Sequence, residues 1–180
     1  AEVAALLACA TEALAELLRN VFNLSLAAEL LADGADPAGF AGIATQSGLI
    51  DIYEDRRMPT TGMTQAAAEA VTAMAASRRL AVRKVDVRHA DVDLVIQAGV
   101  LSTAGDLVSF SHHVLFDHVA GRFYLAWHNP DQMITQLEGD TAAALMLAPA
   151  LRFAIERIWR ADTPGRPQSW KLVCEIFSAT

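Results

Sequence analysis

The chain is poor in cysteine, and its two cysteines follow no metal-binding pattern. Cys9 and Cys174 lie far apart, without a CxxC motif or a combined Cys and His spacing. The sequence therefore predicts neither a structural zinc site nor a framework of several disulfides. A single bridge between these two residues stays open, because only coordinates can test the distance between them.

Positive charge is also scarce. Fourteen Lys and Arg residues stand against twenty-one Asp and Glu residues, which gives a formal net charge of −7, and only two of the basic residues are lysine. Such a chain offers little general attraction for a polyphosphate backbone. We therefore expect that nucleic acid is not its main partner.

Long hydrophobic runs are missing, although the chain as a whole is apolar. Uncharged stretches such as residues 141–151 fall short of the roughly 20 apolar residues that a transmembrane helix needs. Yet 53% of the residues are hydrophobic, and the mean hydropathy is +0.29. This excess predicts either an enclosed cavity for a small apolar molecule or a surface covered by a partner chain, as in a homo-oligomer or a complex subunit. The sequence begins at Ala1 rather than Met, so removal of a leader stays open, and the compartment is left open between the cytoplasm and an organelle for a protein expected to be soluble.

The N-terminal part predicts helices around one strand. Apolar residues recur at threes and fours over residues 3–22, and a short second helix is expected over 25–31. The β-forming run 48–54, GLIDIYE, predicts an edge strand. A third helix is expected from Met63 to the pair 78–79.

The middle of the chain predicts an antiparallel meander. Runs rich in β-branched and aromatic residues are separated by links too short for crossover helices, and they cover residues 80–89, 92–101, 107–116 and 123–128. The predicted fold class is therefore α+β, with a curved antiparallel sheet whose concave face holds the N-terminal helices.

The last fifty residues predict an extension packed on the same domain. A helix is expected over 141–160, bent or split at Pro149, followed by a strand over 170–177. The expected organisation is thus a domain over residues 1–129 and a helix–strand extension over 130–180.

Local sequence within the first domain resembles a known superfamily. Gly62 opens the third helix, residues 93–101 read DLVIQAGVL, and residues 110–116 read FSHHVLF. Together with the order of elements, these stretches resemble the nuclear transport factor 2-like superfamily, also called the SnoaL or ketosteroid-isomerase cone fold. The resemblance implies a cone-shaped sheet around a pocket. It also implies either an isomerase, cyclase or dehydratase, or a non-catalytic scaffold or assembly subunit.

His112 is the first candidate catalytic residue. Strand alternation places it with Phe110 on the apolar face, where a neutral imidazole could exchange a proton with an enclosed ligand. A core histidine bonded to a neighbouring carbonyl is the structural alternative.

Asp51 and Tyr53 share one face of the strand predicted over 48–54. An acid facing an apolar cavity becomes a better base near neutral pH, and a phenol can donate a hydrogen bond. Members of the resembling superfamily often place such groups near this strand. The alternative is that Asp51 belongs to the solvated charge cluster formed with residues 54–57.

Three further side chains are expected to line the pocket. Trp127 lies in register with the apolar face of its predicted strand, while Met63 and Met74 share the apolar stripe of the third helix. The histidines show no HExxH spacing, and the chain contains no GxxxxGK[ST], GxGxxG or GxSxG motif. We therefore predict no metal and no cofactor. Two functions stay open: acid/base chemistry or binding of a small apolar molecule, and non-catalytic assembly with partner chains.

Overall fold

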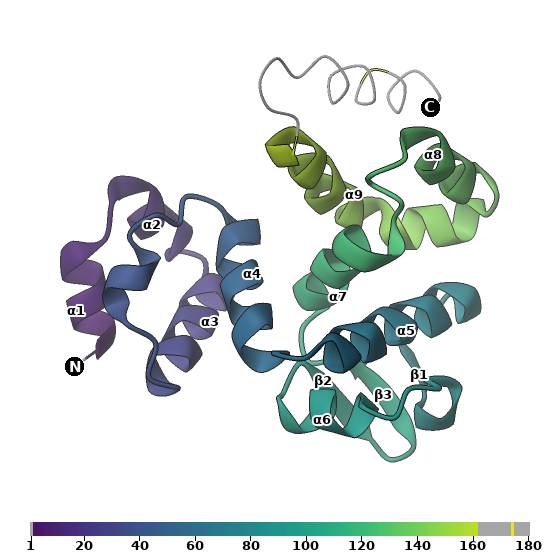
Figure 1. Cartoon of the computed structure of the whole chain (residues 1–180), viewed down its shortest axis with the longest axis horizontal. Helices are drawn as coiled ribbons and strands as arrows, with labels where there is room; N and C mark the ends of the chain where they lie inside the picture. Colours follow the sequence, from purple (N-terminus) through teal and green to yellow (C-terminus); the bar gives the residue numbers. More distant parts are fainter. Residues whose placement is uncertain (1, 162–173, 175–180) are drawn as a thin grey trace. The chain divides into compact units, whose positions relative to one another are not determined.

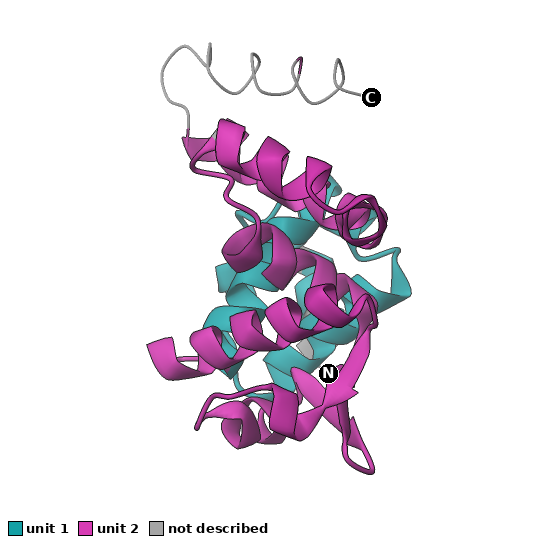
Figure 2. Cartoon of the chain, turned by 90° about the vertical axis from the view of Figure 1, so that its right-hand side faces the viewer, with its two compact units in different colours: residues 1–57 teal, residues 58–180 magenta. Residues whose placement is uncertain are grey.

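The computed structural model describes residues 2–161 and residue 174, and the chain divides into two compact units. Unit 1 covers residues 1–57 and unit 2 covers residues 58–180 (Figure 2). In the described residues, no helix combines the length and the apolar character needed to cross a membrane. Each unit is described by itself.

Unit 1 is helical throughout its described part (Figure 1). Its elements are α1 (Glu2–Cys9), α2 (Glu12–Leu17), α3 (Val21–Ala32), the 3₁₀ helix η1 (Pro37–Phe40) and α4 (Gln46–Arg57). The side chains of Thr11 and Asn20 accept backbone N–H bonds at the starts of α2 and α3. These two caps break the single helix predicted over 3–22 into shorter pieces, because each satisfies the free N–H groups of a new helix end.

The strand predicted over 48–54 is wrong, since these residues lie inside α4. Leu49, Ile50 and Tyr53 are buried, and their spacing of one, three and four positions matches one face of a helix. The same run also alternates, which suggested a strand. Short apolar runs satisfy both periods, so packing against the rest of the unit decides between them.

Unit 2 combines helices with one small sheet (Figure 1). Its elements are α5 (Thr61–Ser77), β1 (Ala81–Arg83), the 3₁₀ helix η2 (Lys84–Asp86), α6 (Val92–Gln97), β2 (Leu101–Ala104), β3 (Leu107–Phe110), α7 (His113–Val119), the π-helical turn η3 (Ala120–Tyr124), α8 (Pro130–Glu138) and α9 (Thr141–Ala161). Thr60 caps α5 by accepting from the N–H of Met63, so this helix begins at Thr61, two residues before its predicted start.

The sheet of unit 2 is antiparallel, with strand order β1-β3-β2. Its hairpin turns at Gly105, whose φ of +66° suits a residue without a Cβ. Helix α5 contacts β1 and α6 on one side and α7, η3 and α9 on the other (Figures 1 and 2). Its face of small residues Ala66, Ala67 and Ala70 is fully buried, which allows these neighbours to approach closely.

The α+β class is confirmed, but the predicted four-stranded meander is wrong. Residues 92–97, the first part of the strand predicted over 92–101, form α6. Strand β2 begins only at Leu101 and ends at Ala104. Strand β3 ends at Phe110, and residues 113–119 form α7. The stretch expected as a strand over 123–128 begins in the π-helical turn η3. Strand lengths are set by the partners available in the sheet, and alternation alone does not contain that information.

The long C-terminal helix is close to its predicted bounds. Helix α9 runs from Thr141 to Ala161 and continues through Pro149, so it is not split there. Asp140 caps it by accepting from the N–H groups of Ala142 and Ala143. The strand predicted over 170–177 lies outside the described residues, apart from Cys174.

Candidate functional site

Helix α7 carries two buried ionisable side chains of unit 2. His113, Asp117 and His118 lie on the helix, and His112 immediately precedes it. Asp117 and His118 are both buried. Burying an ionisable group costs free energy unless the group is paired, so buried ionisable side chains often mark functional sites. Helix α7 is therefore the candidate site in unit 2.

His112 is the N-cap of α7 and does not face an apolar sheet. Its Nδ1 accepts a hydrogen bond from the backbone N–H of Val114 at 3.3 Å, and its ring stacks on His113 with centroids 4.5 Å apart. The placement inferred from strand alternation is wrong, because β3 ends at Phe110. Burial lowers the pKa of His112, and the neighbouring His113 lowers it further, so the neutral form that can accept is favoured.

Asp117 is only 7% exposed. Burial raises the pKa of this carboxyl, while the charges of His113 and Arg152 act in the opposite direction. His113 lies one turn earlier on α7, and Arg152 belongs to α9. Asp117 is therefore influenced by side chains from both α7 and α9, two helices that pack together.

His118 is fully buried beside α9. Its Nε2 lies 3.3 Å from Nη2 of Arg157, and its ring meets Phe153 edge to face with centroids 5.0 Å apart. A guanidinium can only donate, so Nε2 of His118 accepts in this contact. The strands predicted over 107–116 and 123–128 left His118 in the link between them. A helical period through the buried residues Leu115, Phe116 and Val119 was the available signal for α7.

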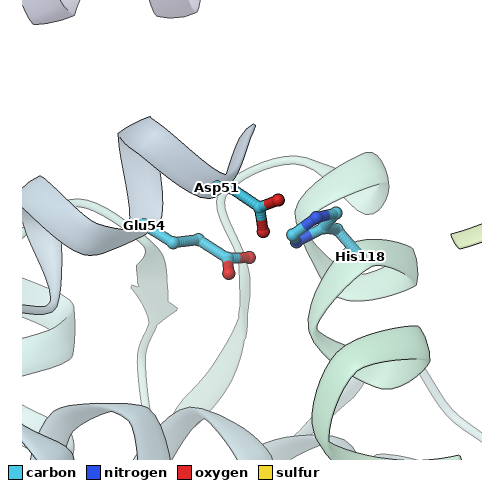
Figure 3. Close-up of side chains that lie close together, drawn as sticks. All are labelled: Asp51, Glu54 and His118. Atoms are coloured by element: carbon cyan, nitrogen blue, oxygen red, sulfur yellow. The ribbon is translucent and has the colours of Figure 1, made fainter. Parts of the chain in front are cut away.

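Asp51 and Tyr53 belong to α4 of unit 1. Figure 3 shows Asp51 and Glu54 extending from α4 and His118 extending from α7. The first two side chains thus belong to unit 1 and the third to unit 2. Asp51 is half-buried, whereas Tyr53 and Glu54 are buried.

Tyr53 is part of a polar clasp between α3 and α4, which we define as Glu29, Asp33, Tyr53 and Arg57. The Tyr53 hydroxyl donates to Glu29 Oε2 at 3.2 Å, and Arg57 Nη2 lies 3.3 Å from the same oxygen. Arg57 also pairs with Asp33 Oδ2 at 3.0 Å. Burial and the negative charge of Glu29 raise the pKa of Tyr53 to about 12. Tyr53 was singled out from the sequence without its hydrogen-bond partner Glu29, which lies 24 positions away.

The side chains expected to line a pocket are mainly packing residues. Phe110 is buried and meets Phe116 edge to face, and Met63 and Met74 are buried in α5. Trp127 is half-buried, and its Nε1 donates to the carbonyl of Arg122 at 3.0 Å. All four belong to unit 2, as does His112, whereas Asp51 and Tyr53 belong to unit 1. The structure therefore does not assemble these seven residues within one unit.

The arrangement on α7 and α9 suits the joining of two helices. The charge of Arg152 on α9 acts on the buried Asp117, and Arg157 contacts the buried His118. Phe153 of the same helix packs on the imidazole of His118. Such pairing lowers the cost of burial and fixes the register of the helices.

Comparison with known proteins gives no family. No protein-family model matches the chain, and neither the curated proteins nor the solved structures contain a significant match.

Proposed function

We propose that this protein is a non-catalytic scaffold or assembly subunit that acts through its folded surfaces. The observation that supports this proposal most is the role of His112, the leading acid/base candidate. Its Nδ1 is engaged as the N-cap of α7. A cap stabilises the local fold and requires no ligand.

Tyr53 supports the same proposal. Its hydroxyl is bonded to Glu29, and a pKa of about 12 makes it a poor proton donor near neutral pH. Both candidates thus have structural roles in the unit to which they belong.

The charge pattern of residues 61–110 disfavours nucleic acid as the partner. A helix, a strand, a short helix and a hairpin, with strand order β1-β3-β2, are similar to the order of a winged helix-turn-helix module. Such modules bind DNA when the helix before the hairpin offers positive charge to phosphates. Here α6 has no basic residue, and Asp91 and Asp93 lie at its start. This charge pattern disfavours DNA.

Exposed apolar side chains give unit 2 material for contacts with other chains. Leu145 on α9 is 74% exposed, and Leu107 on the sheet and Trp159 near the end of α9 are about half as exposed. Large apolar residues at the surface are typical of interfaces when a partner covers them.

The test compares the native mass of the protein's complexes in host extract across variants. Leu145→Asp should shift the protein to a lower native mass, because a buried charge is costly in an apolar interface. His112→Asn, which keeps the cap acceptor, should leave the mass unchanged. The proposal would be contradicted if Leu107→Asp, Leu145→Asp and Trp159→Asp all keep the native mass of the wild type.

Small-molecule chemistry is the second candidate, and one observation favours it. Asp117 is a nearly buried carboxyl with a raised pKa, which is a common property of catalytic acids and bases. This candidate function also depends on the cone fold of the nuclear transport factor 2-like superfamily, and that fold stays a prediction made from the sequence. Loss of ligand binding or turnover in Asp117→Asn, with an unchanged melting temperature, would support it over the scaffold.

A further inference from the structure

We draw no further inference here: the strongest candidate, the exposed apolar surface of α9 at Leu145 and Trp159, belongs to the surface already used for the proposed function, and nothing among the described residues shows what covers it.

Discussion

Unit 1 and unit 2 are stabilised by different kinds of contact. Residues 1–57 contain nine acidic and three basic side chains, and the polar clasp joins α3 to α4. Residues 58–180 contain twelve acidic and eleven basic side chains, and η3 approaches α9 closely at Gly121. A polar clasp tolerates small changes in volume but depends on its partners. Close backbone packing does not tolerate added volume but depends little on polar partners. Substitutions can therefore distinguish the two units.

The largest effect is expected from Gly121→Ala in unit 2. A Cβ at this position would lie 2.7 Å from the carbonyl oxygen of Ala150 and 2.9 Å from Cβ of Phe153. Because backbone of α9 must move to make room, we expect a loss of about 2–3 kcal/mol in the free energy of unfolding. Urea denaturation measures this loss, and hydrogen exchange in peptides covering 113–158 should locate it.

The matched control for this test is Gly42→Ala in unit 1. Nothing lies within 4 Å of a Cβ built at Gly42, so the free energy of unfolding should change by less than about 0.5 kcal/mol. Equal losses in the two variants would contradict the contrast between the units.

The second effect tests the polar clasp of unit 1. Tyr53→Phe removes the hydrogen bond to Glu29 and should cost about 1 kcal/mol near neutral pH. The folded-state pKa of about 12 is above the ordinary value of 10.0 for tyrosine, so this stabilisation is present below pH 10 and is lost as the pH rises toward 12. Urea unfolding at pH 9 and pH 11 should show a steeper fall for wild type than for Tyr53→Phe.

Tyr124→Phe is the control, because Tyr124 lies in unit 2 and outside the clasp. It should leave the wild-type pH dependence in place. Absorbance at 295 nm provides a direct check on Tyr53, and ionisation of this phenol near pH 10 would rule out the proposed environment.

A third and similar effect is expected at His112, where unit 2 also depends on a polar contact. His112→Ala should cost about 1 kcal/mol at pH 8, while His112→Asn should retain most of the stability because its amide oxygen can accept from Val114. The folded pKa of His112 is lowered, so the cap contributes above the unfolded value of 6.5 and is lost as the pH falls through the folded value. The difference between wild type and His112→Ala should therefore shrink at pH 5, as measured by urea unfolding. An undiminished difference at that pH would show that His112 acts by packing.

The sequence predicted features that depend on local chemistry. Helix α5 (Thr61–Ser77) lies close to the helix predicted from Met63 to the pair 78–79, because its apolar stripe is a short-range pattern. The near-correct bounds of α9 follow from a long helical period. These signals need no knowledge of distant residues.

Features that depend on distant partners were not predictable. Strand β3 ends at Phe110 because Leu101, its partner, is the first residue of β2. This end point turns His112 from an expected pocket residue into a helix cap. The sequence predicted a catalytic role for Tyr53, but its hydrogen bond to Glu29 depends on a residue 24 positions away, which the segment around Tyr53 does not indicate.

The smallest effect is expected for exposed ion pairs, and it should be the same in both units. Arg19 and Glu16 form an exposed pair in unit 1, and Arg83 and Asp86 form one in unit 2. Glu16→Gln and Asp86→Asn should each leave the free energy of unfolding nearly unchanged, because solvent and salt screen exposed pairs. Urea unfolding in low and high salt measures both. A larger loss of stability in Asp86→Asn alone would mean that the pair of Asp86 with Arg83, the last residue of β1, also stabilises the sheet.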